Sequence, residues 1–120
     1  MTEITTLPLP LRRKLYLSSD VDATSMEDLS SSIIDINDSD NYLEKLYKIH
    51  DLDYKAKPIE IFIDSYGGYV YQCMGLLGVM EKSKTPIYTY ATGAAMSCGF
   101  MILISGHKRY ASPSFFRILG

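Results

Sequence analysis

An apolar, β-branched run that leads directly into a pair of glycines constrains the fold of this 120-residue chain more than any other feature. The run at 59–63 (IEIFI) follows Pro58 and is rich in isoleucine, which predicts a β-strand. Gly67 and Gly68 then form a turn, and apolar side chains spaced three and four residues apart predict a helix over 70–82.

The same order of elements recurs immediately downstream. Residues 87–91 are typical of a second strand, residues 92–96 form a small-residue turn, and Ser97 opens a helix that runs to about Ser105 before Gly106. Strands that alternate with helices in this way predict an α/β fold of repeated β-α-β units, with a parallel sheet layered against helices.

The N-terminal part of the chain supplies another strand and two predicted helices. Lys14–Leu17 is a strand candidate, and Thr24 or Ser25 can cap a helix whose apolar face ends at Ile36. Polar residues 37–40 predict a break, and Asn41, with Glu44 three residues later, begins a second helix. The apolar face predicted for this second helix is Leu43, Leu46, Tyr47 and His50. The domain organisation predicted is a flexible arm over 1–10 followed by one domain over 11–120. The remaining elements predicted are a charged loop over 51–57, an extended pair at 110–111 and a strand over 115–119.

Composition excludes several classes of protein. Twelve Lys and Arg face 14 Asp and Glu, so the chain is not a basic nucleic-acid binder, and 47% hydrophobic residues exclude a disordered chain. Cys73 and Cys98 form neither a disulfide framework nor a CxxC metal motif, so we expect two reduced thiols in a cytoplasmic protein without a metal.

One uncharged stretch, residues 85–106, has the length of a membrane span. Its first part is polar and aromatic and Gly93 interrupts it, so we predict a buried strand and a buried helix instead. Residues 1–10 carry Glu3 and two prolines, which does not fit a signal peptide.

Chemistry is expected at the two strand-turn-helix junctions. Gly67 and Gly68 let backbone amides approach a phosphate or an oxyanion, although paired glycines also occur in plain tight turns, and GxGxxG is absent. Ser97 is either a helix N-cap or a nucleophile at a sharp turn. The N–H groups of Gly68 and Cys98 can stabilise a developing oxyanion. Cys98 is a rival nucleophile. Because it lies one position inside the helix, however, its side chain should face the protein interior.

Together the two junctions resemble the proteolytic subunit of the Clp protease, ClpP, a serine peptidase of the ClpP/crotonase fold. The family pattern N-S-P-G-G appears here as Asp64-Ser65-Tyr66-Gly67-Gly68, and G-x-A-A-S-M-G as Gly93-Ala94-Ala95-Met96-Ser97-Cys98-Gly99. The second glycine and the serine are 29 positions apart, as in the family. Gly106, Lys108-Arg109-Tyr110-Ala111 and Pro113 resemble the family run G-x-K-R-F-A-x-P.

The resemblance implies that Ser97 is the nucleophile and that the amides of Gly68 and Cys98 form the oxyanion hole, with no cofactor. It also implies a polypeptide substrate, an oligomeric ring and an AAA+ unfoldase partner. The family histidine falls seven residues after Pro113, at Gly120, and the family aspartate lies beyond it. We therefore expect a partial head domain, truncated before the handle and inactive or nearly so alone.

Other positions also depart from the family. Residues 37–50 match an insertion, and the motif proline is Tyr66. The positions that match the family's unfoldase-docking pockets are Glu60, Phe62 and Lys82, of which only Phe62 is aromatic, so the match to the family's docking pattern is incomplete.

Neither histidine replaces the missing base in the sequence. His50 falls on an apolar helix face, and His107 follows the helix that Ser97 begins, about 14 Å away along its axis. His107 is expected to contact the carbonyls at the end of that helix.

Three alternative functions remain open at this stage. The chain can be a non-catalytic subunit of a mixed ring, or a crotonase-type protein that binds an acyl-thioester through the same amides. A membrane signal-peptide peptidase on a similar fold would pair Ser97 with a lysine, and the spacing of Lys82, Lys84 and Lys108 selects none of them.

Overall fold

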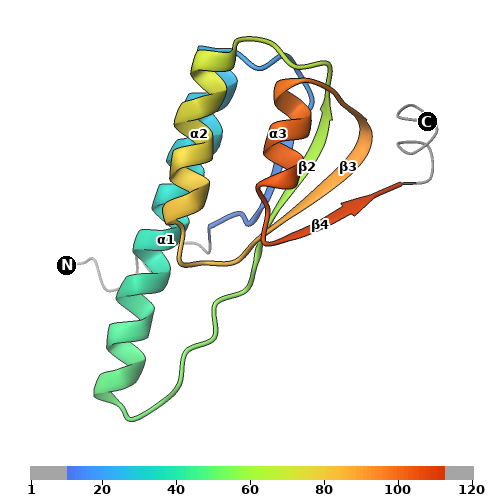
Figure 1. Ribbon diagram of the computed structural model, residues 1–120. Coiled ribbons are helices and arrows are strands. Elements are labelled where there is room, and N and C mark those ends of the chain that lie inside the picture. Colours follow the sequence, from blue (N-terminus) through green and yellow to red (C-terminus); the bar gives the residue numbers. More distant parts are fainter. Residues whose placement is uncertain (1–10, 113–120) are drawn as a thin grey trace.

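The computed structural model describes residues 11–112 as one parallel sheet with three helices (Figure 1). The strands lie side by side in chain order, β1-β2-β3-β4, and every neighbouring pair is parallel. This confirms the predicted α/β class with repeated β-α-β units. The elements are β1 (Lys14–Leu17), α1 (Ala23–Ile49), β2 (Ile59–Ser65), α2 (Val70–Lys82), β3 (Ile87–Ala95), α3 (Cys98–Ile104) and β4 (Lys108–Ala111). The arm predicted over 1–10 and the strand predicted over 115–119 lie outside the described residues.

The core lies between the sheet and the helices, which cover the same face of the sheet (Figure 1). Alternation along β2 explains this, because Ile59, Ile61 and Ile63 are fully buried while Glu60 and Phe62 point to the other face. The helices contribute apolar residues at helical spacing to the same core, namely Met26, Leu29, Ile33, Ile36, Cys73, Leu76, Met80, Cys98, Ile102 and Leu103.

The prediction of two helices separated by a break at 37–40 is wrong, because α1 is one continuous helix of 27 residues. It begins after Asp22, whose side chain accepts the Ser25 N–H while the Ser25 hydroxyl accepts the Asp22 N–H. This capping box, rather than Thr24 or Ser25 alone, sets the start of the helix.

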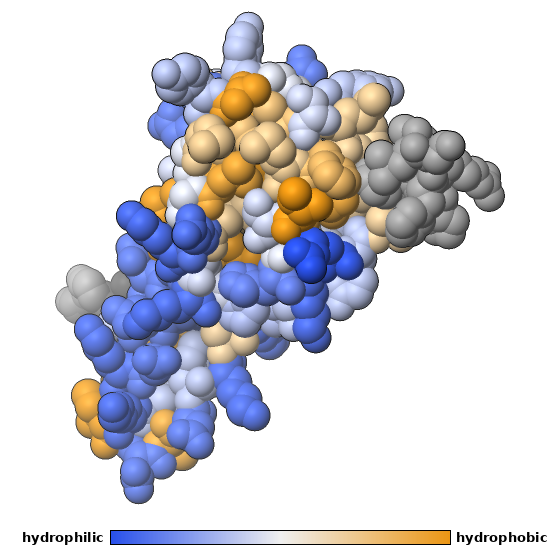
Figure 2. All heavy atoms as spheres, in the orientation of Figure 1, coloured by the Kyte–Doolittle hydropathy of each residue, from blue (hydrophilic) through white to orange (hydrophobic). Residues whose placement is uncertain are grey.

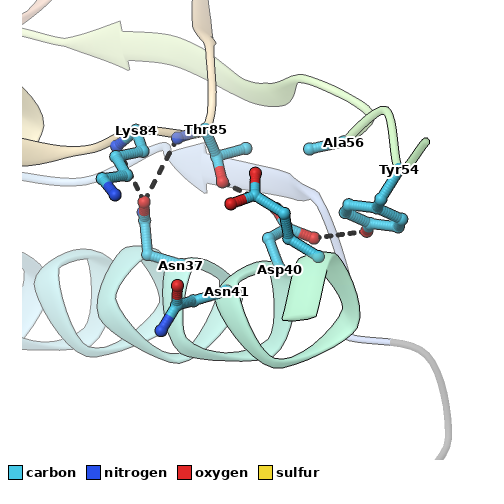
Figure 3. A pocket seen from close by; sticks show the side chains of 8 residues that line it. Asn37, Asp40, Asn41, Tyr54, Ala56, Lys84 and Thr85 are labelled. Atoms are coloured by element: carbon cyan, nitrogen blue, oxygen red, sulfur yellow. Dashed lines mark hydrogen bonds between the residues drawn. The ribbon is translucent and has the colours of Figure 1, made fainter. Parts of the chain in front are cut away.

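The polar residues at 37–40 do not end the helix, and two of them, Asn37 and Asp40, bind groups outside it (Figure 3). Asn37 accepts the backbone N–H groups of Lys84 and Thr85 at 2.9 and 3.2 Å. Asp40, buried among polar partners, accepts the hydroxyls of Tyr54 and Thr85, each at 2.6 Å. The small polar cavity in Figure 3 is thus lined by structural contacts that connect α1 to the segment entering β3.

The second half of α1 has a different environment from the first. Beyond Asp40 the predicted apolar face is not buried: Leu46 and Tyr47 are exposed, and Leu43 is half-buried. These residues do lie on one helix as predicted, but they do not pack into the core, because this part of the helix extends beyond the sheet (Figure 1). Residues 51–58 return toward β2 without regular structure, which agrees with the charged loop predicted over 51–57.

The strands after the glycine turn are longer than predicted. β3 runs to Ala95, so most of the small-residue turn expected at 92–96 is strand. The Ala94 N–H donates to the Asp64 carboxylate at 2.9 Å, which holds the end of β3 against β2. The uncharged stretch 85–106 is β3 and α3, as expected, and no helix within residues 11–112 is long and apolar enough to cross a membrane.

Apolar side chains also remain uncovered on α2 and α3, where Figure 2 shows a broad hydrophobic area. The exposed members are Val70, Tyr71, Met74, Phe100 and Ile104. Apolar surface of this kind on a small domain is typical of a face that contacts another part of an assembly.

Candidate active site

The two junctions singled out in the sequence meet at one edge of the sheet. β2 and β3 are parallel neighbours, so the turn after Ser65 and the turn after Ala95 leave the sheet side by side. Ser65 pairs with Ala95, and the Ser65 carbonyl accepts the Met96 N–H at 3.1 Å. Residues 30 positions apart in the chain are thereby held in direct contact.

Ser97 occupies a strained turn between β3 and α3. Its φ of 50° and ψ of −117° lie in a region that residues with a side chain rarely adopt. The serine is exposed, and its side chain makes no capping hydrogen bond to α3 although it stands at the N-cap position. The simple N-cap explanation therefore does not account for Ser97. A sharp strand-to-helix turn that presents a free hydroxyl is the geometry that a nucleophile requires.

The Gly67-Gly68 turn packs directly against Ser97. Gly67 has φ of 100°, and a Cβ there would lie 2.9 Å from the Met96 carbonyl and 3.0 Å from the Ser97 Cβ. A Cβ on Gly68 would overlap the Val21 carbonyl. Only glycine allows both the backbone conformation and this close approach.

Hydrogen bonds hold this turn on both sides of Gly68. The Val21 N–H donates to the Gly67 carbonyl at 2.8 Å, and the Tyr69 N–H donates to the Val21 carbonyl at 2.9 Å. Cys98 is the first residue of α3, so its N–H has no partner within the helix. The Cβ position of Gly67, the residue before the predicted donor Gly68, lies 3.3 Å from this nitrogen, so the glycine turn packs directly against the start of α3.

The thiol of Cys98 is buried against the glycine turn. Cys98 is completely buried, as expected, and its Sγ donates to the Gly68 carbonyl at 3.5 Å. Behind it, the Cys73 Sγ donates to the Cys98 carbonyl at 3.7 Å. Burial, with a smaller effect of the neighbouring Cys98 thiol, raises the pKa of Cys73 to about 11. Both thiols are therefore buried groups, which argues against Cys98 as the nucleophile.

Neither histidine stands beside Ser97 in the described part of the chain. His107 follows the far end of α3, which is about 10 Å long. The expectation that it binds helix carbonyls is wrong. The His107 Nδ1 accepts the backbone N–H of Ile87 at 2.9 Å, and the backbone N–H of His107 donates to the Ile87 carbonyl. His50 ends α1, about 40 Å of helix from the end that lies next to the glycine turn.

The lysines considered for a Ser-Lys pair are equally remote from the serine. Lys82 ends α2 and Lys84 precedes β3, whereas Ser97 follows the other end of β3. Lys108 begins β4 opposite Tyr88, near the start of β3. No group of three or more His, Cys, Asp or Glu within residues 11–112 is arranged to hold a metal ion.

Sequence reasoning missed two residues that fasten the junctions together. The buried Ser65 hydroxyl accepts the Gly67 N–H at 3.1 Å and so shapes the turn from inside. Asp64 bonds the Ala94 N–H and lies so close to Gly93 that a Cβ there would overlap its carboxylate. An acid and a serine shortly before a glycine pair are frequent turn-forming residues, and that was the available signal.

Comparisons with known proteins place this site in context. The sequence pattern of the Clp protease family matches residues 13–118. The ATP-dependent Clp protease proteolytic subunit of Bdellovibrio bacteriovorus is 35% identical over 66 residues, which are 53% of this chain and 31% of that protein. The ATP-dependent Clp protease proteolytic subunit 2 of Treponema pallidum is 36% identical over 53 residues, or 44% and 27% of the two chains. These matches span less than a third of each relative.

Solved structures agree with the sequence comparison. The ClpP protease catalytic domain of Plasmodium falciparum superposes with a TM-score of 0.63 at 25% identity, over 82% of this chain and 49% of that one. A ClpP1 mutant from Listeria monocytogenes gives a TM-score of 0.65 at 22% identity, over 86% and 53%, and shows the fold. This chain therefore spans about half of the structures that it matches. With the family pattern extending over almost the whole chain and the fold shared with solved ClpP structures, the protein belongs to the Clp protease family.

Proposed function

We propose that this chain is a ClpP-like serine endopeptidase subunit that acts on unfolded polypeptides through an acyl-enzyme. The observation that carries the proposal is the strained, uncapped Ser97 packed against the Gly67-Gly68 turn. The Ser97 hydroxyl would attack the scissile carbonyl, and its proton would pass to a base and then to the leaving amine. The N–H groups of Gly68 and Cys98 would stabilise the negative oxygen of the tetrahedral intermediate.

The base must come from outside the described residues. Both histidines are remote from Ser97, and loss of one member of a catalytic triad removes most of the rate enhancement. We therefore expect the 120-residue chain by itself to hydrolyse peptides very slowly. The chemistry as proposed needs neither a metal nor a cofactor.

The proposed setting is a cytoplasmic ring of subunits that encloses the cleavage sites, as the family membership suggests. An AAA+ unfoldase is the partner that the family implies. Among the three matched docking positions, Phe62 keeps an aromatic side chain while Glu60 and Lys82 are charged. We expect such an unfoldase to couple weakly, if the ring forms from this chain alone.

A second candidate function is a non-catalytic subunit of a mixed ring. The distance of both histidines from Ser97 favours it, because a chain without a base can still contribute its sheet and helices to a ring. In this role the chain would associate with complete ClpP-type subunits and leave peptide hydrolysis to them.

Labelling with a fluorophosphonate tests the main proposal and separates it from the second. The wild-type chain and Ser97→Ala would be treated with the reagent, alone and mixed with a complete ClpP-type subunit whose own serine has been replaced. Labelling at Ser97 only in the mixture supports a subunit that receives its base in the assembly. Association without labelling supports the non-catalytic role, and rapid labelling of the isolated chain would contradict the expected inactivity.

A further inference from the structure

We propose that a pocket on the sheet face opposite the helices, here called the basic pocket, selects docking partners that present acidic residues. The pocket lies over the beginnings of β1, β2 and β3 and has a volume of about 530 Å³. The inference rests on the proposed function, in which an unfoldase docks on this chain, and it names the chemistry of the docking segment. Among the positions matched to docking, only Glu60 lines the pocket, so the residues described below add to that pattern.

Basic side chains gather around the pocket although the whole chain carries a net charge of −2. The basic residues that line it are Arg12, Arg13, Lys14 and Lys57. Within residues 11–112 the one acid that lines it is Glu60. Lys108 adds a further positive charge at the border, because its Nζ lies over the ring of the lining residue Tyr88, 5.3 Å from the ring centroid. The pocket is therefore a local concentration of positive charge on an acidic chain.

Arg13 fixes the shape of the pocket rather than adding charge for a partner. Its guanidinium group is paired with Asp40 and also donates to the Lys57 carbonyl at 3.0 Å. The Glu60 N–H in turn donates to the Arg13 carbonyl at 2.8 Å. These bonds hold the segment that enters β2 beside the start of β1. The basic residues on both segments are thus positioned before a partner arrives, which lowers the entropy cost of binding.

The other three basic lining residues have no acidic partner in the described part of the chain. The one ion pair within residues 11–112 is that of Arg13, whereas Arg12, Lys14 and Lys57 are exposed and contact no acid at ion-pair distance. Glu60 stands opposite Lys14 in the register of β1 and β2, but its carboxylate accepts a tyrosine hydroxyl at 2.7 Å instead. Asp35 of α1 lines a neighbouring hollow and forms no ion pair across the edge of β1.

Tyrosine rings form the wall of the pocket, and their faces are already in use. Tyr90 is stacked on both Phe62 and Tyr110, with ring centroids 4.9 Å apart in each pair. Tyr16 is stacked on Phe62 at 5.3 Å. Basic side chains lie over the rings of Tyr16 and Tyr88. Because nucleic-acid bases bind by stacking on free ring faces, this wall suits the side chains of a peptide better than it suits a nucleotide.

Charge and shape together favour an extended acidic segment as the occupant. Carboxylates are the side chains that bind guanidinium and ammonium groups, and Arg12, Lys14 and Lys57 come from two different segments of the chain. A segment with several carboxylates reaches more of these charges than a single small anion does. Exposed charges of this kind contribute more to partner choice and to the rate of association than to affinity. The basic pocket would therefore act mainly by selecting among partners.

Fluorescence anisotropy with labelled peptides tests the charge requirement on the 120-residue chain. The probes are decapeptides that alternate leucine with glutamate, glutamine or lysine, each carrying the same uncharged dye, and an oligothymidylate of similar length. We expect the glutamate peptide to bind about tenfold more tightly than the glutamine peptide, and added salt to remove most of this difference. A glutamate peptide that binds no better than the glutamine or lysine peptide would overturn the proposal. Tighter binding of the oligothymidylate would assign the pocket to nucleic acid and would overturn it too.

Two variants of equal net charge locate the binding site. Arg12→Gln with Lys14→Gln removes two charges from the basic pocket, and Lys45→Gln with Lys48→Gln removes two from exposed positions of α1 outside it. We expect the first variant to bind the glutamate peptide about fivefold more weakly and the second to bind it as the wild type does. An equal loss in both would mean that the net charge of the chain attracts the peptide, which contradicts the proposal.

Charge reversal provides an independent gain of function. Arg12→Glu with Lys14→Glu should bind the lysine peptide more tightly than the glutamate peptide, and an unchanged preference would contradict the assignment. All substituted side chains are exposed, and circular dichroism establishes that each variant is folded. None of these measurements involves Ser97 or peptide hydrolysis, so failure of the peptidase proposal would be recognised separately.

Discussion

Replacing Asp40 by asparagine tests how the base of α1 is fixed to the sheet. The carboxylate is buried and accepts hydrogen bonds from the Arg13 guanidinium, the Tyr54 hydroxyl and the Thr85 hydroxyl. These donors come from three separate segments of the chain, so one side chain joins α1 to the residue before β1, to the loop before β2 and to the segment that enters β3. Asparagine keeps the size of the side chain but removes its charge and turns an NH₂ toward groups that themselves donate.

The magnitude follows from the pKa of this carboxyl group. Burial is the largest single influence and raises the pKa, but the bonds from Arg13, Thr85 and Tyr54 together outweigh it and lower the pKa from 3.8 to about 2. That difference corresponds to about 2 kcal/mol of folding free energy at neutral pH. Because the folded state has the lower pKa, this stabilisation is complete above about pH 5 and is lost as the pH falls toward 2.

Urea unfolding followed by circular dichroism measures the effect. At pH 7 we expect Asp40→Asn to lower the free energy of unfolding by about 2 kcal/mol, and at pH 3 the gap to the wild type should be about 1 kcal/mol smaller. Asp38→Asn, an exposed acid on the same helix, should change stability by less than about 0.5 kcal/mol at either pH. A gap for Asp40→Asn that is equally large at both pH values would refute the ionic explanation.

Three further predictions concern the site and the core. Gly67→Ala should cost about 2 kcal/mol in urea unfolding, because it adds a Cβ at φ of 100° against a backbone carbonyl, whereas Gly75→Ala, in open space on α2, should stabilise by up to about 1 kcal/mol. The thiols of Cys73 and Cys98 should resist Ellman's reagent at pH 8 in the native chain and react once urea unfolds it, since both are buried; rapid native reaction would contradict the structure. Thr89→Val should lower the unfolding free energy by about 1 kcal/mol, because the buried hydroxyl donates to a carbonyl of α3 at 2.6 Å; no loss would mean that this bond contributes nothing.

The strands and the site junctions were predictable because local patterns dictate them. Alternating isoleucines predict a strand with one buried face, as β2 has, and the Gly67-Gly68 pair marks the turn that follows. Placing Ser97 beside that turn needed one topological step, namely that parallel neighbouring strands end at the same edge. The strained backbone of Ser97 and its uncapped hydroxyl became visible only in the structure.

The course of α1 was not predictable from local signals. Asn37 and Asp40 are residues that favour helix breaks in isolation, yet here their side chains bind Lys84, Thr85, Tyr54 and Arg13 while the helix continues. The partners are up to 48 positions away, so no window along the sequence contains both ends of these bonds. The same holds for His107, whose partner is the start of β3 rather than the helix before it.

By itself the sequence determined the α/β class, the two glycine- and serine-bearing junctions and the family to which they belong, because strand periodicity and turn chemistry act over a few residues. Tertiary structure decided the features that depend on contacts between distant segments. It buried the Cys98 thiol while leaving the amide of the same residue beside Ser97, and it kept α1 whole and carried its apolar end beyond the sheet. Hydrogen bonds and packing between distant segments compensate locally unfavourable choices, and only the folded chain brings those segments together.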